Sequence, residues 1–394
     1  MKRSAVILRN VGHGVNDIYW FLLPSILPLI IEQFHLTYGT AGGILTAFLG
    51  VAALFSFILG RISDRFPRHI ILSAGFLSAS IFLIGAAFME RLSVFVVLLL
   101  TAGIGVASFH PATYAEIEET TESRKGMAYG MFEFYGSVAI FAMFFLHGFL
   151  LKQLSLRNII IITSLPGLIM GSIFLWSGRM LQFGSVHLKE IVSHEADRNK
   201  PPDILFVILL VVIALRLFSI ISVVNFTPTY LVREVGLGKD MASFATSIYF
   251  IGGLIFTPIV GKLCDIRSPY PVLLIATGVI FPLILLMSYT PPLWILPLNL
   301  ILLGGAYYGS WPAMDMIIAQ MSRKKGKGEA FGYFVSITAI AYSFSPLLFG
   351  IVADRVGLKL SMRFFSFPLL LCTGAFFLIF RVVRLGNTVY SSRR

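Results

Sequence analysis

GIGVASFHPA, residues 103–112, and GGAYYGSWPA, residues 304–313, decide the fold of this chain. Both stretches are rich in glycine, both end in Pro-Ala, and they begin 201 positions apart. Two further pairs keep nearly the same offset: GRISD at 60–64 with GKLCD at 261–265, and GMAYGMF at 126–132 with GEAFGYF at 328–334. Offsets of 201 or 202 positions indicate that one unit has been duplicated.

The composition places this unit in a membrane. Hydrophobic residues make up 57% of the chain and charged residues 13%, and the mean hydropathy is +0.86, values that lie outside those of soluble domains. A membrane-spanning helix needs ~20 mostly apolar residues. Twelve such spans are expected, at Val11–Phe34, Ala41–Gly60, Ile70–Met89, Leu92–Tyr114, Gly126–Leu151, Asn158–Ser177, Ile204–Val232, Met241–Gly261, Pro271–Tyr289, Leu293–Met321, Ala330–Ala353 and Met362–Phe380. The first is interpreted as a retained span, because its apolar run is too long for a signal peptide.

The distribution of Lys and Arg predicts the orientation. An even number of spans puts both termini on one side, and 22 of the 31 basic residues fall on that side, against 8 on the other. The positive-inside rule therefore predicts cytoplasmic termini in the cell inner (cytoplasmic) membrane. The net charge of +12 is then topogenic and suited to anionic membrane lipids, so nucleic acid is not an expected partner.

The predicted domains follow from the polar stretch at 179–203, which divides the chain near its middle. We expect a six-helix bundle at 1–178, a cytoplasmic linker at 179–203, and a second six-helix bundle with a cytoplasmic tail at 204–394. The fold class is all-α, with two pseudo-symmetric halves around a central cavity. Halves related by an axis along the membrane normal are the architecture of major facilitator transporters.

The stretch GRISDRFPRH, residues 60–69, resembles the loop motif of the major facilitator superfamily. Gly60, Asp64, Arg65 and Arg68 fill the motif, Pro67 replaces its usual Gly, and Gly261 with Asp265 forms a degraded copy. The resemblance implies a conformational latch, in which the glycine lets helices approach and the aspartate accepts bonds from a helix N-terminus or an Arg. The alternative is that these charges are solvated and only set topology.

Within that superfamily, the chain resembles the fosmidomycin-resistance-type exporters over nearly its whole length. The resemblance rests on His13, Asn16, Asp17, Leu23 and Pro24 in the first span, on Phe109, His110 and Pro111 in the fourth, and on Arg216, Phe226, Tyr230 and Leu231 in the seventh. One departure is the fifth span, which lacks the Gly-Pro pair of related antiporters. This departure leaves proton-independent transport open.

Ionisable groups inside the spans need an explanation, since each costs ~2.5–3.5 kcal/mol at a helix centre. They are His13, Asp17, His110, Glu133, His147, Arg216 and Asp315. His13, Asn16 and Asp17 share one helical face, at spacings of three and four residues. A carboxyl group removed from water favours its neutral form, which suits a proton carrier. The predicted proton-coupling residues are Asp17, Glu133, His110 and Asp315, whereas His147 is interpreted as structural.

Arg216 keeps its charge, so it must find an anion, a carbonyl group or water. It either pairs with Asp17, Glu133 or Asp315, or binds an anionic group of a substrate, for which a guanidinium is well shaped. The predicted substrate-binding residues are His13, Asn16, Arg216, Asn225, Tyr230 and Trp311. The alternative for His13 is a polar cytoplasmic end of the first span in contact with lipid headgroups. For His110 and Trp311 the alternatives are a hydrogen-bonded histidine and a packed aromatic ring.

No enzyme is expected, because the sequence has no P-loop, HExxH or paired CxxC motif. Its seven histidines are scattered, so no metal site and no cofactor is expected. The sequence predicts a monomeric secondary transporter that exports small amphipathic or anionic compounds by alternating access, with proton antiport. The alternatives are a proton-independent facilitator, an importer or lipid transporter, and a non-transporting sensor or assembly factor on a transporter scaffold.

Overall fold

The computed structural model describes residues 3–63, 65–121, 123–177, 204–322 and 327–391. These residues form fifteen α-helices and no β-strand. The first half contains α1 (Arg3–Gln33), α2 (Tyr38–Ser63), α3 (Arg68–Ala87), α4 (Leu92–Val106), α5 (Phe109–Thr120), α6 (Lys125–Leu150) and α7 (Leu156–Ser177). The second half contains α8 (Ile204–Arg233), α9 (Lys239–Ile266), α10 (Tyr270–Ser288), α11 (Leu296–Tyr308), α12 (Trp311–Ser322), α13 (Lys327–Val356), α14 (Leu358–Ser366) and α15 (Pro368–Ser391).

The predicted spans are found as helices. Eleven segments of the described chain are long and apolar enough to cross a membrane, one of them formed by α4 with part of α5. The remaining predicted span, the tenth, is broken into α11 and α12, which have 13 and 12 residues. The expected all-α membrane fold of two six-span halves is thereby confirmed. The predicted linker at 179–203 lies outside the described residues.

Two span boundaries differ from the prediction. The first helix begins at Arg3 rather than Val11, because the polar residues before the apolar run remain helical and Arg9 is buried. The last span is divided into α14 and α15 at Phe367. Pro368 explains this break, since proline has no backbone N–H to continue the hydrogen bonding of α14. A hydropathy profile alone shows neither the early start of α1 nor the break at Phe367.

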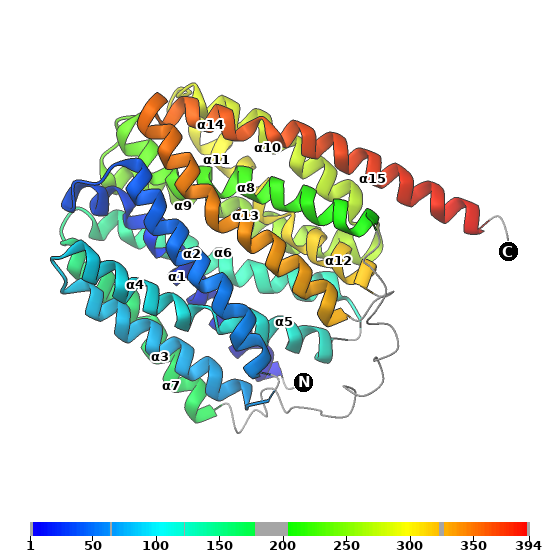
Figure 1. Cartoon of the computed structure of the whole chain (residues 1–394), viewed down its shortest axis with the longest axis horizontal. Helices are drawn as coiled ribbons and strands as arrows, with labels where there is room; N and C mark the ends of the chain where they lie inside the picture. The colour runs from blue at the N-terminus through cyan, green and yellow to red at the C-terminus, as the bar shows by residue number, and fades with distance from the viewer. Residues whose placement is uncertain (1–2, 64, 122, 178–203, 323–326, 392–394) are drawn as a thin grey trace.

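The two halves meet along two seams. Figure 1 shows α3, α4 and α7 along one edge of the molecule and α10, α14 and α15 along the opposite edge. Between these edges, α6 packs against α9 and α2 packs against α13. We call the face where α1 begins and α15 ends the terminal face, and the face where α1 ends and α2 begins the distal face.

Glycines bring the backbones at these seams into contact. A Cβ on Gly42 of α2 would lie 2.1 Å from the carbonyl oxygen of Pro346 in α13, and a Cβ on Gly261 of α9 would lie 2.5 Å from the oxygen of Gly126 in α6. Small residues at such positions permit close packing of membrane helices. Gly126 and Gly261, which belong to the repeated stretches, therefore serve the junction between the halves.

The repeated stretches at 103–112 and 304–313 break their helices within one residue of the same point. Ala107 and Ser108 separate α4 from α5, and Gly309 and Ser310 separate α11 from α12. Pro111 cannot donate to the oxygen of Ala107, which instead accepts a hydrogen bond from the Ser56 hydroxyl at 3.1 Å. The bilayer offers no such donor, so α2 supplies it.

The seam predicts different outcomes for two adjacent glycines. Gly42→Ala places a methyl group against backbone, and we expect a loss of about 1–3 kcal/mol of stability from overpacking. Gly43→Ala has only the Leu347 side chain within 4 Å, at 3.7 Å, and should leave stability unchanged or raise it. Apparent melting temperatures of both variants in detergent check this, and equal melting temperatures would contradict the close approach of α2 and α13.

Candidate functional site

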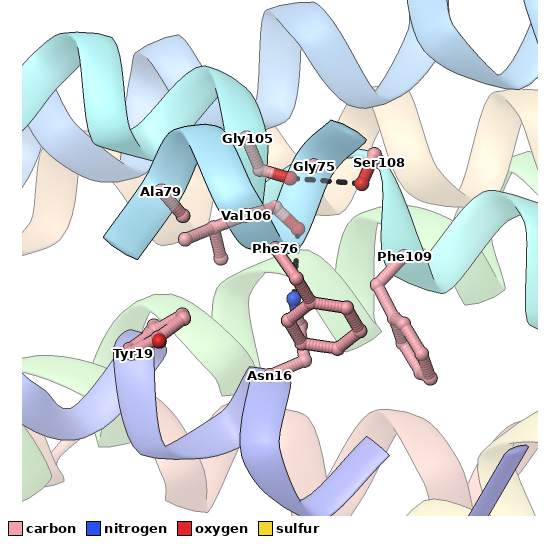
Figure 2. Close-up of a pocket in the computed structure, with 9 residues that line it drawn as sticks. All are labelled: Asn16, Tyr19, Gly75, Phe76, Ala79, Gly105, Val106, Ser108 and Phe109. Carbon is pink, nitrogen blue, oxygen red and sulfur yellow. Dashed lines mark hydrogen bonds between the residues drawn. The ribbon is translucent and has the colours of Figure 1, made fainter. Parts of the chain in front are cut away.

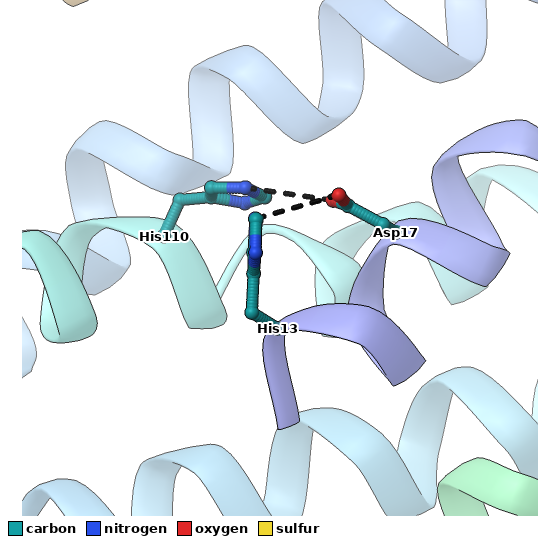
Figure 3. Close-up of side chains that lie close together, drawn as sticks. All are labelled: His13, Asp17 and His110. Carbon is teal, nitrogen blue, oxygen red and sulfur yellow. Dashed lines mark ion pairs between the residues drawn. The ribbon is translucent and has the colours of Figure 1, made fainter. Parts of the chain in front are cut away.

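Three of the predicted functional residues meet at one point. His13 and Asp17 come from α1 and His110 comes from α5, and Figure 3 shows both imidazoles directed at the Asp17 carboxylate. His13 Nε2 lies 3.4 Å from Asp17 Oδ2, and His110 Nε2 lies 3.7 Å from Asp17 Oδ1. His13 is only 1% exposed and Asp17 is also buried, whereas the His110 side chain is 26% exposed. We call His13, Asp17 and His110 the His–Asp–His trio.

The hydrogen bonding of His13 fixes which of its nitrogens carries a proton. His13 Nδ1 lies 2.7 Å from the carbonyl oxygen of Phe132, and because a carbonyl only accepts, Nδ1 donates. In the neutral ring, Nε2 then presents a lone pair toward the Asp17 carboxylate, and Nε2 has no hydrogen-bond partner. Two acceptors face each other, so this geometry calls for one additional proton between them.

Aromatic rings hold the trio in place. The His13 ring stacks on Phe132 of α6 with centroids 3.6 Å apart, and Trp20 meets the His110 ring edge-on at 6.0 Å. On α6, a Cβ at Gly136 would lie 2.3 Å from Asp17 Oδ2. The carboxylate is therefore pressed against the α6 backbone, where only glycine fits.

A second carboxylate lies beside the trio. Glu133 of α6 is buried, and its Oε1 accepts a hydrogen bond from the Tyr114 hydroxyl at 3.3 Å. Other charged or titratable groups that interact electrostatically with the trio are Arg9 from α1 and Tyr308 and Tyr342 from the second half. Tyr114, Tyr308 and Tyr342 were not predicted from the sequence, because tyrosine in an apolar span carries no distinctive signal.

Asn16 ties the first helix to the break in the fourth span. Its Nδ2 donates to the oxygen of Val106 at 3.0 Å, and its Oδ1 accepts from Trp20 Nε1 at 3.0 Å. Figure 2 shows Asn16 directed at this break, with Tyr19 among the residues that line the same narrow cleft of the first half. The cleft is too small to admit a water molecule, which makes it a packing seam rather than a substrate pocket.

Arg216 lies in the second half with neutral partners. Its Nε donates to the Thr277 hydroxyl at 3.0 Å and its Nη2 to the Ser310 hydroxyl at 2.6 Å, while Nη1 lies 3.7 Å from the Met314 sulfur. The side chain is 0% exposed. No ion pair joins it to Asp17, Glu133 or Asp315, all of which belong to the described residues. The predicted pairing alternative is thus not seen.

Tyrosines that interact with Arg216 were also not predicted from the sequence. Tyr249 and Tyr307 interact electrostatically with the guanidinium. The Tyr249 and Tyr308 hydroxyls are buried without hydrogen-bond partners in the described chain. They are therefore donors that an anionic group could engage.

The other predicted substrate residues lie apart from the trio. Tyr230 donates its hydroxyl to the oxygen of Met287, which joins α8 to α10, and Asn225 is buried with Nδ2 unpaired among the described residues. Trp311 is half-buried at the start of α12, with its ring 6.1 Å from that of Tyr307. Asp315 is buried on the same helix. In the described part of the chain these residues do not gather at one site, and each remains a candidate by itself.

Of the two aspartates of the predicted latch, the structure describes the second one, Asp265. Asp265, at the end of α9, accepts hydrogen bonds from the backbone N–H groups of Gly126 at 2.8 Å and Met127 at 2.9 Å, at the start of α6. This contact crosses between the halves at the terminal face. In the first copy, Asp64 lies outside the described residues, Gly60 packs against Pro111, Arg65 is exposed and Arg68 is buried.

The sequence argument against a metal cage relied on the scatter of the histidines, and folding removes that scatter for two of the seven. One donor atom from each member of the trio lies within 4.8 Å of the others. The trio combines one carboxylate with two imidazoles. The Nδ1 hydrogen bond of His13 leaves its Nε2 lone pair available to a proton or to a metal ion.

Fold and site together define a membrane transporter built from two six-span halves. The family model of the Major Facilitator Superfamily matches residues 10–190 and 208–392. The chain therefore belongs to the Major Facilitator Superfamily.

Proteins similar to this chain include two resistance proteins. The fosmidomycin resistance protein of Escherichia coli K12 is 23% identical over 370 residues, which cover 92% of this chain and 89% of that protein. The multidrug resistance protein MdtG of Salmonella typhi is 23% identical over 349 residues, which cover 86% of each chain.

A solved structure shares the fold. It is a bacterial homologue of the human lysosomal transporter Spinster, in an inward-facing and occupied conformation. The TM-score is 0.71 at 17% sequence identity, with 95% of this chain and 96% of that chain covered. At this identity, the similarity shows the fold alone.

The surroundings of Arg216 predict an unusual stability result. Desolvating an unpaired charge costs several kcal/mol, so Arg216→Met should leave the apparent melting temperature in detergent unchanged or raise it by a few degrees. Arg216→Lys keeps the charge but loses the planar fork that reaches both hydroxyls, and should be less stable than Arg216→Met. A loss of about 3–5 kcal/mol in Arg216→Met would instead show that Arg216 holds a fixed structural ion pair.

Proposed function

We propose that this protein is a secondary active exporter that exchanges protons for small amphipathic or anionic compounds by alternating access. The observation that carries the proton assignment is the His–Asp–His trio. Since His13 donates from Nδ1 to a backbone oxygen, its Nε2 and the Asp17 carboxylate require a proton between them. Asp17, with His110 on its other side, is the proton-binding group.

The release of this proton is coupled to the movement of the halves. The trio comes from α1 and α5 of the first half, while Tyr308 and Tyr342 of the second half interact electrostatically with Asp17. A substrate that enters between the halves changes the surroundings of the Asp17 carboxylate only on the side of the second half. Glu133, hydrogen-bonded to Tyr114, is the second proton carrier in this proposal. Proton entry across 100 mV supplies ~2.3 kcal/mol per charge.

The substrate assignment rests on the second half. Arg216 has only neutral partners in the described chain, and the Tyr249 and Tyr308 hydroxyls offer further donors. A guanidinium with hydroxyl donors suits a phosphonate, phosphate or carboxylate group. The similarity to a fosmidomycin resistance protein and a multidrug resistance protein supports export. Asn16, Asn225, Tyr230 and Trp311 remain proposed substrate-side residues.

The proposal includes a sidedness and an oligomeric state. The terminal face is the cytoplasmic side of a bacterial inner membrane, as the distribution of basic residues predicts, and the protein works as a monomer. The alternative is a proton-independent facilitator. One observation favours that alternative: α6 contains no proline, in contrast to the Gly-Pro pair that the resemblance to antiporters leads one to expect.

Proton flux in proteoliposomes with an internal pH-sensitive dye tests the coupling. Phosphonates, organic phosphates, carboxylates and lipophilic cations are added in turn, and at least one anionic class should start a flux. Asp17→Asn should reduce this flux at least about tenfold, since loss of an essential proton carrier removes the coupled step. His147→Gln is the matched control, because His147 is buried on α6 but bonds Thr163 instead.

Two results separate the alternatives. If labelled substrate equilibrates equally fast in the parent protein and in Asp17→Asn, with no dye response in either, the protein is a facilitator and proton coupling is wrong. If Arg216→Met keeps the flux for anionic compounds, Arg216 is not the anion-binding group.

Adding a chelator should leave the flux unchanged, because the trio is proposed to hold a proton.

A further inference from the structure

A second carboxylate joins the halves, at the opposite face from Asp265. Asp354, in the last turn of α13, accepts hydrogen bonds from two backbone N–H groups at the start of α2. The Oδ1 atom lies 2.7 Å from the nitrogen of Tyr38, and Oδ2 lies 2.8 Å from the nitrogen of Gly39. These are among the first N–H groups of a helix, which have no partner within it.

The contact is charged as well as hydrogen-bonded. A helix N-terminus carries partial positive charge, and a carboxylate placed there is stabilised. Asp354 thus binds α2 of the first half through both carboxylate oxygens while belonging to α13 of the second half. The contact includes no member of the His–Asp–His trio and no proposed substrate-binding residue.

The neighbouring residues hold the same face closed. Gly350, one turn before Asp354, approaches α2 so closely that a Cβ there would lie 2.2 Å from the oxygen of Tyr38. Lys239 at the start of α9 forms an ion pair with Glu32 at the end of α1, which again joins the two halves. The two halves are therefore in contact at the distal face both between α2 and α13 and between α1 and α9.

The duplication shows that this aspartate is specific to one seam. At the repeat offset of 202 residues, Gly350 corresponds to Gly148 and Asp354 corresponds to Lys152. A lysine cannot accept hydrogen bonds from a helix N-terminus. Accordingly α9, the counterpart of α2, carries its own acid, Asp240, in its first turn. The carboxylate cap across the halves was kept or gained only in the second copy.

We propose that Asp354 is the distal-face latch of this transporter, paired diagonally with Asp265 at the terminal face. Asp265 fastens the α6–α9 seam, and Asp354 fastens the α2–α13 seam. Opening of the distal face breaks the Asp354 contacts and leaves those of Asp265 intact, whereas opening of the terminal face does the reverse. The inference rests on alternating access and is independent of the proposed coupling ion and substrate.

Spin-label distances in the full-length protein test the latch. One pair of labels is placed at Arg91→Cys and Leu293→Cys, exposed positions of the distal face that correspond in the repeat. A second pair is placed at Phe66→Cys and Ile266→Cys on the terminal face, which are 57% and 70% exposed. The buried native Cys264 and Cys372 are replaced by alanine. Double electron–electron resonance then gives the open population of each face.

Asp354→Ala should raise the open population of the distal face about fivefold, the factor that corresponds to ~1 kcal/mol of helix capping. Asp354→Asn retains one acceptor and should lie between Asp354→Ala and the parent. Asp265→Ala should open the terminal pair and leave the distal pair unchanged. Asp240→Asn is the matched control, because Asp240 is an acid of the distal face in the first turn of its own helix, α9.

The reciprocal pattern is what identifies a latch. If Asp354→Ala leaves the distal distances as they are in the parent, or widens both faces equally, Asp354 is a local cap and the proposal is wrong. A variant that fails to fold is recognised by loss of the terminal-face distance peak, and Asp354→Asn then decides. An Asp240→Asn protein with the same distal opening as Asp354→Ala would also overturn the proposal.

Discussion

The bilayer cannot hydrogen-bond to a backbone carbonyl, and this constraint organises the centre of the molecule. Pro111 and Pro312 interrupt the fourth and tenth spans, so each freed group must find a donor within the protein. Ser56 and Asn16 supply donors beside the break in the first half, at Ala107 and Val106. The resulting turn starts α5 at Phe109 and brings His110 to Asp17. The same local break therefore satisfies the backbone and builds the trio.

The sequence predicted the fold because its signals are simple in physical terms. Long apolar runs specify spans, and the repeat at 103–112 and 304–313 specifies two halves. It also placed His13, Asn16 and Asp17 on one helical face, since helical periodicity fixes relations within a span. The helix broken at Phe367 was missed, because a hydropathy window averages over one proline.

Relations between helices were harder to obtain. The sequence could not show that His110, 93 positions after Asp17, lies 3.7 Å from it, or that Arg216 bonds Thr277 and Ser310 rather than a carboxylate. These contacts depend on helix rotation, which one sequence does not specify. Asp354 escaped notice for a similar reason: it follows the apolar part of its span and looks like a solvated charge until α2 is placed beside it. Tyr114, Tyr308 and Tyr342 gave no pattern at all.

The two halves have diverged chemically while keeping one architecture. The first half holds the acid and the imidazoles, whereas the second holds a guanidinium that cannot release its charge. Arg216 lies twelve residues into α8, deep within the apolar region. Any displacement of α8 along the membrane normal carries that charge through part of the transmembrane field, which is worth ~2.3 kcal/mol per 100 mV for a complete crossing. If α8 moves along the membrane normal as the two faces exchange, the membrane voltage acts directly on the protein through the charge of Arg216.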